Sequence, residues 1–304
     1  MLFFLLVFGV LAAAELPVPL GLDPYMQIPK NSPLTKEAVL LGRRLFRDKA
    51  LSRDGTVSCA SCHDAAISFT DGKPLAVGID DLRGTRNSPT LINRGYGASF
   101  FWDGRTPTLE QLALEPIFNV IEMDTPLDQI VPKLRKAGYP RDIQNADVAR
   151  AIAAYLRTIR SGNSRYDRHI NGDRIYTKEE QLGLDLFSSK AHCWSCHTGN
   201  NFTDEQFHNT GIAWKNAKLT DPGRGRTGAF KTPTLRDLSR TAPYMHDGSL
   251  PTLEAVIDYY DRGANPNPHL DPALQPLHLT PEEKRALKAF LLTLTGDVTE
   301  GWPQ

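Results

Sequence analysis

The feature that most constrains this chain is a pair of Cys-x-x-Cys-His strings, which together contain all four of its cysteines. The first runs over 59–63 as Cys-Ala-Ser-Cys-His, and the second runs over 193–197 as Cys-Trp-Ser-Cys-His. Such a string attaches a c-type haem through two thioether bonds, and its histidine binds the iron as the proximal ligand. We therefore expect two covalent haem c groups, attached and ligated by Cys59, Cys62, His63, Cys193, Cys196 and His197.

Other uses of paired cysteines fit this pattern less well. The ligand pairs of a zinc ribbon lie much closer together in sequence than these two strings do, and zinc gives no reason for a histidine at the same place after both pairs. A redox Cys-x-x-Cys pair has no use for a following histidine. Exported proteins usually form disulfides, but every cysteine here belongs to a haem string.

The N-terminus predicts export to the periplasm. An apolar run from Leu2 to Leu11 is followed by three alanines before Glu15, which is typical of a secretory signal peptide over residues 1–14. The run is shorter than the roughly 20 residues that cross a bilayer, so we expect no membrane span after cleavage. Because no Lys or Arg precedes the run, an upstream start codon and an uncleaved anchor are the alternatives.

The charge balance argues against nucleic acid as a partner. The 304 residues carry 35 Lys and Arg against 35 Asp and Glu, so no net field attracts a polyanion or an anionic membrane. The length is sufficient for two domains of ordinary size.

An internal repeat predicts the domain organisation. Motifs around the first haem string recur in the same order around the second, and each half closes with an apolar helical stripe. We expect an all-α fold of two tandem cytochrome c-like domains with long loops, related by duplication, over 15–165 and 166–304 and joined near 161–176. The paired segments are 42–46 with 183–187, 69–71 with 202–204, 89–91 with 233–235, and 103–110 with 247–254.

Helix signals support this assignment. The residues Val148, Ile152, Tyr155 and Ile159 fall on one helical face, and Gly162 follows as a stop signal. Capping boxes predict two further helix starts, and no sustained alternating run predicts a sheet. The boxes are Thr177 with Glu180 and Thr280 with Glu283, the latter with Pro281 at the first helical position.

The two halves differ at one informative position. Tyr260 of the second half corresponds to Pro116 of the first, and a tyrosine can ligate haem iron whereas a proline cannot. If this position overlies the iron in both halves, the first haem has an open face, and Glu122 is a candidate acid-base group over it. The alternatives are a buried aromatic residue for Tyr260 and a solvated surface acid for Glu122.

The order and spacing of several segments resemble those of the bacterial di-haem cytochrome c peroxidase and MauG superfamily. The resemblance extends from about residue 33 to residue 296. Besides the two haem strings, it rests on 86–90 (Arg-Asn-Ser-Pro-Thr), 101–105 (Phe-Trp-Asp-Gly-Arg), 116–123 with its Glu-Met end, and 241–248 (Thr-Ala-Pro-Tyr-Met-His-Asp-Gly).

The resemblance implies a role for individual residues. His63 would ligate a peroxidatic haem and His197 an electron-transfer haem, with Glu122 as the distal acid and Trp102 as the aromatic relay between the haems. Tyr260 falls where peroxidases of the family have a methionine ligand and where MauG has a tyrosine. Neighbouring Tyr259 and Met245 are alternative ligands of the second haem.

The resemblance also implies a calcium ion between the domains. Its ligands would be the side chain of Asn87 and the backbone carbonyls of Thr241 and Pro243. Oxygen donors of this kind suit calcium.

The sequence departs from the family at two positions. Peroxidases of the family place a histidine at the register of Ile79, where it blocks the peroxidatic iron in the oxidised resting protein, and isoleucine cannot bind iron. A glutamine that is common in the distal pocket corresponds to Leu112, so a hydrogen-bond partner of Glu122 is missing there.

The resemblance implies an oxidoreductase that reduces hydrogen peroxide to water. Glu122 would move a proton between the two oxygens, and electrons would come from a small cytochrome c or a cupredoxin. One alternative is a MauG-like enzyme that oxidises a protein substrate, which Tyr260 and Ile79 favour. The other alternative is a non-enzymatic di-haem electron carrier or peroxide sensor.

Overall fold

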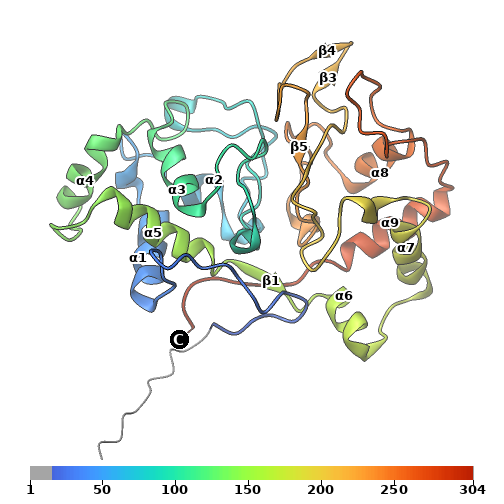
Figure 1. The fold of residues 1–304 in the computed structure, drawn as a ribbon, viewed down its shortest axis with the longest axis horizontal. Helices are drawn as coiled ribbons and strands as arrows, with labels where there is room; N and C mark the ends of the chain where they lie inside the picture. The colour runs from blue at the N-terminus through green and yellow to red at the C-terminus, as the bar shows by residue number, and fades with distance from the viewer. Residues whose placement is uncertain (1–15, 304) are drawn as a thin grey trace, which may run out of the picture.

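The chain forms two groups of helices that lie side by side, with short strands between them, in a computed structural model that describes residues 16–303 (Figure 1). We call residues 16–162 the first half and residues 163–303 the second half. The prediction of a mainly helical protein is confirmed. The predicted signal segment, 1–14, lies outside the described residues, and no described helix has the length and apolarity needed to span a membrane.

The first half contains the elements from α1 to β1. They are α1 (Lys36–Arg47), η1 (Lys49–Leu51), α2 (Cys59–Cys62), η2 (Ala65–Ile67), η3 (Ile79–Asp81), η4 (Arg94–Tyr96), α3 (Leu109–Phe118), α4 (Leu127–Lys136), α5 (Asn145–Leu156) and β1 (Arg160–Gly162).

The second half contains the elements from α6 to β6. They are α6 (Arg165–Arg168), η5 (His169–Asp173), α7 (Lys178–Ser188), η6 (Cys193–Ser195), β2 (Phe207–His208), β3 (Trp214–Lys215), β4 (Lys218–Leu219), β5 (Phe230–Lys231), η7 (Leu238–Arg240), α8 (Leu253–Asp261), α9 (Pro281–Leu292) and β6 (Asp297–Thr299).

The helix starts follow the capping signals. Thr177 and Thr280 each accept a hydrogen bond from the backbone N–H three residues on, and both capping boxes form. The helix α5 ends at Leu156, earlier than the predicted stop at Gly162, although Ile159 is still fully buried beyond it.

Each half is built on a pair of helices that cross at a glycine. A Cβ on Gly42 of α1 would lie 1.9 Å from the carbonyl oxygen of Ala151 in α5, and one on Gly183 of α7 would lie 2.0 Å from that of Ala286 in α9. Any side chain at these positions would push the helices apart, so the glycines permit both crossings. The crossings organise two separate apolar cores, one in each half.

The strands form three antiparallel pairs, of which β1–β6 joins the halves. Beyond β1 the chain enters the second half, where the ring of Tyr166 packs on Phe202 and Phe290. The region near 161–176, predicted as a linker, therefore carries α6 and η5 and contributes to the second core. Beyond β6 the chain returns to the first half, where Glu300 accepts hydrogen bonds from Arg43 and Arg47.

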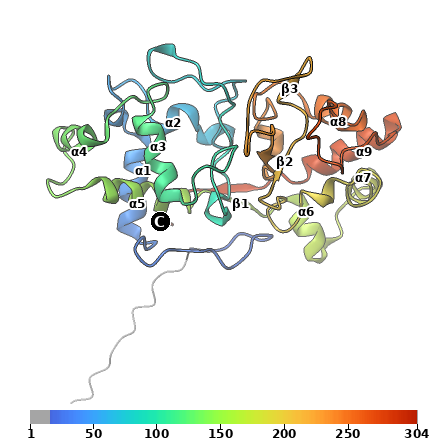
Figure 2. The same cartoon turned by 45° about the horizontal axis from the view of Figure 1, so that its top comes forward.

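An N-terminal strap, residues 16–34 of the first half, runs below the helices of that half and reaches the edge of the second half near α6 (Figure 2). Near one end, Leu20 exchanges two hydrogen bonds of 2.9 Å with Asn163, and the carbonyl of Gly21 accepts one from Arg236. Further along, the carbonyl of Asp23 accepts a hydrogen bond from Tyr96 of the first half. The strap therefore ties the two halves together from outside.

Ion pairs hold the seam between the halves. Arg86 of the first half makes a bidentate pair with Asp221 of the second, at 2.8 and 2.9 Å. Arg94 makes a similar pair with Glu205. Bidentate pairs of this kind restrict geometry as well as supplying energy, so they fix how the two halves face each other.

Candidate haem sites

The two histidines predicted as proximal ligands have matching surroundings. The Nδ1 of His63 lies 2.9 Å from the carbonyl oxygen of Phe69, and the Nδ1 of His197 lies 3.0 Å from that of Phe202. A histidine that donates its Nδ1–H to a carbonyl presents an unprotonated Nε2 to a metal. Burial lowers the pKa of both imidazoles, which favours this neutral form. Both sites therefore fit a haem iron.

The cysteines also fit haem attachment. All four are free of disulfides. Burial raises the pKa of the Cys59 thiol to about 12, and the pKa of Cys193 likewise to about 12, so the surroundings favour a neutral sulfur such as a thioether. Among residues 16–303, the possible metal ligands that lie close together are Cys196, Asp204 and His208, and this group contains neither complete cysteine pair.

Glu122 lies in the turn after α3, near enough to the first cysteine pair for its charge to add to burial in raising the pKa of both thiols. Burial raises the pKa of the Cys62 thiol to about 11, and the nearby charges of Asp71 and Glu122 add to this rise. Burial likewise raises the pKa of Glu122, against the opposing effects of Arg105 and of a hydrogen bond from Asn119. Glu122 is thus not the solvated surface acid of the alternative interpretation.

The Ile79 loop packs directly on the Glu122 turn. The backbone N–H of Ile79 donates to the carbonyl oxygen of Glu122 at 2.9 Å, and the Ile79 side chain is only 1% exposed. The structure therefore brings these two predicted residues together. Leu112, on α3, packs against the first core and offers no polar atom.

Tyr260 lies near the second cysteine pair in the same way. Thr108 caps α3 and Thr252 caps α8, so Pro116 and Tyr260 occupy equivalent turns of matching helices. Burial raises the pKa of the Tyr260 hydroxyl, and neighbouring Tyr259, Cys193 and Cys196 add to this rise.

The alternative ligand Tyr259 has other partners. Its hydroxyl donates to the carbonyl oxygen of Thr210 at 2.7 Å and accepts from the N–H of Asn265 at 3.2 Å. Met245 packs in the same small cluster as both tyrosines, at a positive φ of 76°. Of the two tyrosines, Tyr260 is the one whose pKa is affected by Cys193 and Cys196.

Trp102 lies at the seam and contacts both halves. Its Nε1–H donates to the carbonyl oxygen of Asn87 at 2.9 Å, and its own carbonyl accepts from the N–H of Lys231 at 2.8 Å. Its ring meets the edge of the His246 ring at 6.5 Å, and His246 stacks on Phe230 at 3.7 Å. Burial lowers the pKa of His246 to about 4, so this aromatic group is neutral.

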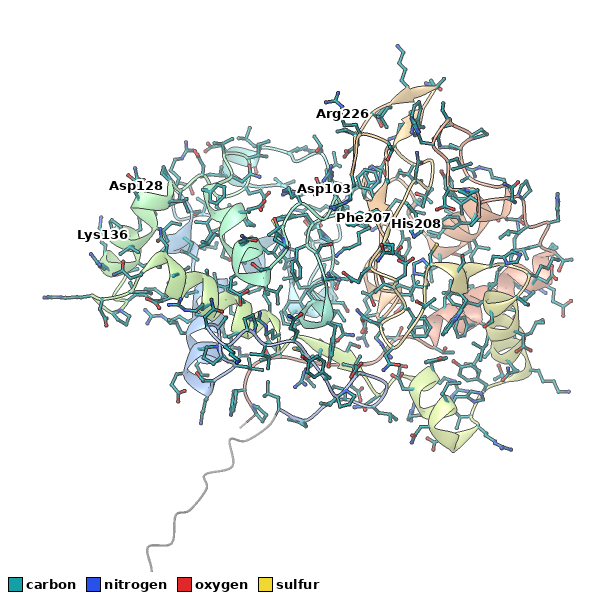
Figure 3. All side chains as sticks on the ribbon, viewed as in Figure 1. Asp103, Asp128, Lys136, Phe207, His208 and Arg226 are labelled. Atoms are coloured by element: carbon teal, nitrogen blue, oxygen red, sulfur yellow. The ribbon has the colours of Figure 1, made fainter. Side chains whose placement is uncertain are left out.

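The remaining seam contacts are also tight. Gly104 has a positive φ of 63°, and a Cβ there would lie 2.2 Å from the ring of Phe207. Figure 3 labels Asp103 and Phe207 along this boundary, with His208 beside them. The guanidinium of Arg224 covers the Phe207 ring at 4.2 Å and reaches the carbonyl of Gly104 at 3.2 Å. The region that carries Trp102 is thus closely packed.

Asn87 connects the predicted calcium ligands. Its Nδ2 donates to the carbonyl of Lys73 at 2.7 Å, which directs its Oδ1 elsewhere. Its backbone N–H donates to the carbonyl of His246 at 2.7 Å, in the same segment as Thr241 and Pro243. The first half therefore reaches the predicted ligand segment, and the calcium site stays a prediction.

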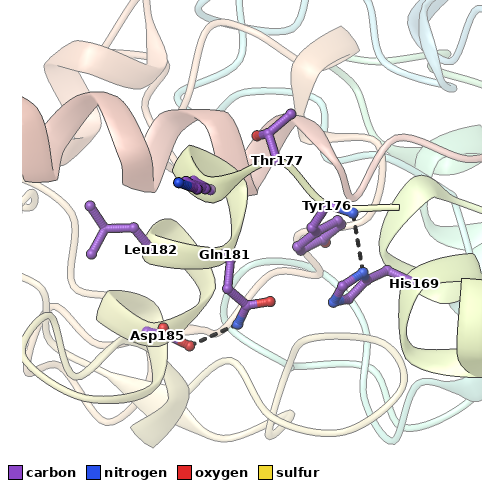
Figure 4. Close-up of a pocket in the computed structure, with 7 residues that line it drawn as sticks. His169, Tyr176, Thr177, Gln181, Leu182 and Asp185 are labelled. Carbon is purple, nitrogen blue, oxygen red and sulfur yellow. Dashed lines mark hydrogen bonds between the residues drawn. The ribbon is translucent and has the colours of Figure 1, made fainter. Parts of the chain in front are cut away.

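Sequence reasoning missed Asn119, His246 and Phe230 as parts of these surroundings. Asn119 could have been found from the sequence, because it lies three residues before Glu122 and directly after the helical segment of α3. The other two depend on tertiary contacts. An open hollow beside α7, lined by His169, Tyr176 and Asp185 among others, contains none of the predicted site residues (Figure 4).

Comparison with known proteins agrees with these features. A family model described as di-haem cytochrome c peroxidase matches residues 36–175, and a cytochrome c model matches residues 180–295. The chain consequently contains two cytochrome c-like domains, whose exact borders remain predictions.

Several named proteins are similar over most of their length. The methylamine utilization protein MauG of Methylorubrum extorquens is 39% identical over 290 residues, which cover 88% of this chain and 81% of that protein. The cytochrome-c peroxidase IdrP2 of Denitromonas iodatirespirans is 34% identical and covers 95% of this chain and 88% of its own length. The crystal structure of a MauG-like protein associated with microbial copper homeostasis superposes with a TM-score of 0.82 at 33% identity, covering 93% of this chain and 95% of that one.

Proposed function

Since the chain belongs to the family of di-haem cytochrome c peroxidases and MauG proteins, we propose that it reduces hydrogen peroxide to water with electrons from a small redox protein. The observation that carries this proposal is the contrast between the two distal positions. A protonatable Glu122 faces the first haem string, and a tyrosine faces the second. The first haem would then be open to a substrate, and the second would serve electron transfer.

The residues that hold the haems are the cysteines and proximal histidines described above. A haem on His63 supplies the redox chemistry that cleaves the oxygen–oxygen bond. His63 is held by its hydrogen bond to Phe69, which fixes the direction of Nε2.

Glu122 handles the protons. It would take a proton from one oxygen of the peroxide and return it to the other, which leaves as water. With two electrons and two further protons, one hydrogen peroxide gives two waters. Burial raises the pKa of Glu122 toward the working pH, which is where a group that both accepts and donates a proton is most effective.

Trp102 carries electrons from the second haem to the first. Two hydrogen bonds and an aromatic neighbour hold it, one bond from each half, so its position does not depend on either half alone. Tyr260 would hold the second haem through its phenol oxygen, which the bound iron would ionise.

The setting of the enzyme completes the proposal. It works in the periplasm after removal of residues 1–14, and its electron donor is a small cytochrome c or a cupredoxin. A calcium ion held by Asn87, Thr241 and Pro243 stiffens the contact between the halves. The equivalent glycine crossings at Gly42 and Gly183 support an origin by internal duplication.

A second candidate function is MauG-like oxidation of a protein substrate. The tyrosine at position 260 and the isoleucine at position 79 favour it, because MauG shares the tyrosine and because an unblocked first haem needs no activating reduction. Steady-state turnover separates the two functions. Rapid peroxide consumption with a reduced small cytochrome c as donor supports the peroxidase, and consumption no faster than a haem blank contradicts it.

A further inference from the structure

We infer that Asn119 is the residue that positions Glu122, and that it confines the transferable proton to one oxygen of that carboxyl group. This inference rests on the proposed proton-transfer role of Glu122. In this arrangement a residue of the turn after α3 gives Glu122 the hydrogen bond that a glutamine at position 112 would otherwise give.

The orientation of the Asn119 amide is fixed by the backbone. Its Oδ1 accepts a hydrogen bond from the N–H of Ile121 at 3.0 Å, and an N–H can only donate. The other end of the amide, Nδ2, must therefore be the atom that points at Glu122. It donates to Oε1 of Glu122 at 2.7 Å.

This orientation determines where the Glu122 proton lies. Because Oε1 accepts from Nδ2, a proton on Oε1 would weaken this hydrogen bond, whereas a proton on Oε2 leaves it intact. The neutral form of Glu122 therefore carries its proton on Oε2, and Oε2 is the atom that exchanges protons with a substrate. A carboxyl group held at one oxygen and free at the other has one direction for proton transfer.

The turn itself is rigid. The carbonyl oxygen of Asn119 accepts the N–H groups of Glu122, Met123 and Asp124 at 2.9 to 3.1 Å. On its other side, the carbonyl oxygen of Glu122 accepts from the N–H of Ile79 at 2.9 Å. The backbone under the carboxyl group is thus fixed from both ends, and Asn119 completes the arrangement by fixing the side chain.

The charges around Glu122 oppose each other. Arg105 favours its ionised form, and Glu115, which pairs with Arg105 at 2.9 Å, opposes ionisation. The hydrogen bond from Asn119 also favours the ionised form. Removing this bond therefore raises the pKa of Glu122 above its already raised position.

Asn119→Asp is the sharpest test, because aspartate is isosteric with asparagine. One carboxylate oxygen still accepts from Ile121, so the turn keeps its fold, while the donor to Glu122 is replaced by an oxygen. Two carboxyl groups in contact hold a shared proton to higher pH. Asn119→Ser is a second variant, since a serine hydroxyl still accepts locally from the backbone but cannot reach Glu122.

The experiment uses the ferric protein with both haems attached. The C=O stretch of protonated Glu122 is followed by difference infrared spectroscopy against pH, with Glu122→Gln to assign the band, and the rate of the first reaction with peroxide is measured over the same pH range. We expect the titration midpoint and the acid limb of the rate to move upward together, by about one pH unit or more in Asn119→Asp and by less in Asn119→Ser. The loop variant Val120→Ala, at an exposed side chain, should match the wild type.

The outcomes distinguish a failure of the Asn119 role from a failure of the proposed Glu122 role. If Glu122→Gln slows the reaction but neither Asn119 variant moves the infrared midpoint or the pH limb, Asn119 does not position Glu122. If Glu122→Gln reacts at the full rate, the proposed role of Glu122 fails instead.

Discussion

The two halves of the molecule share a scaffold but differ at one position of a matching helix. In both, a histidine is held by a phenylalanine carbonyl, and in both a helix pair crosses at a glycine. The same helical position carries Pro116 in one half and Tyr260 in the other. The comparison teaches that the packing of the two halves is shared, while the side chains that differ lie on one helix and the turn after it.

The largest expected effect comes from replacing the Glu122 carboxyl group in the first half. Glu122→Gln keeps the size of the side chain and the contact with the Asn119 turn, but it removes the group that moves the proton. We expect peroxide to bind while the cleavage step slows by about 10²–10⁴-fold. Stopped-flow spectroscopy at several peroxide concentrations separates binding from cleavage. A variant that reacts at the wild-type rate contradicts the assignment of Glu122.

The next prediction concerns the first haem in the oxidised resting protein. With Ile79 at the register of the blocking histidine, we expect the first haem to be five-coordinate and high-spin in the oxidised protein, without a need for activating reduction. The first half offers no other histidine besides the proximal one. The remaining histidines all lie in the second half: His169, His192, His208, His246, His269 and His278.

Ile79→His is the corresponding variant. The Ile79 loop is hydrogen-bonded to the Glu122 turn, so an imidazole at position 79 would lie next to that turn. It should convert the first haem to low spin and make peroxide reactivity depend on prior reduction of the second. Electron paramagnetic resonance of the ferric protein reports both haems at once. Two low-spin signals already in the wild type would show that another residue closes the site.

The sequence was sufficient where the signal is local. Each haem string is a contiguous motif, and the helix starts at Thr177 and Thr280 follow from capping boxes that contain their own partners. The return of the chain after β6, which brings Glu300 to Arg43, could not be predicted, because nothing near residue 300 specifies which core it joins. Asn119 shows the same limit within the site, since its role depends on the direction of its amide.

A smaller effect is expected in the second half, at Tyr260. Tyr260→Phe removes the phenol oxygen but keeps the ring that fills the space beside Cys193 and Cys196. We expect both haems to remain attached, the ligand field of the second to change, and its reduction potential to rise, because an anionic oxygen ligand favours ferric iron. Spectroelectrochemical titration measures this change. The matched control Tyr259→Phe loses only the hydrogen bonds to Thr210 and Asn265 and should leave the potential in place.

The smallest expected effect concerns the predicted calcium site between the two halves. If calcium binds Asn87, Thr241 and Pro243, its removal loosens a contact that also supports Trp102, because the carbonyl of Asn87 accepts from the Trp102 indole. Since Arg86, Arg94 and the N-terminal strap still hold the halves together, we expect a partial loss of activity that calcium restores, not unfolding. Electron transfer between the haems should slow, while the first reaction of peroxide at the His63 haem stays unchanged. Metal analysis of the purified protein, with activity measured before and after chelation, decides the point. A protein that contains no calcium and is unaffected by chelators has no such site. The ion pairs and the strap then set the distance between the two halves by themselves.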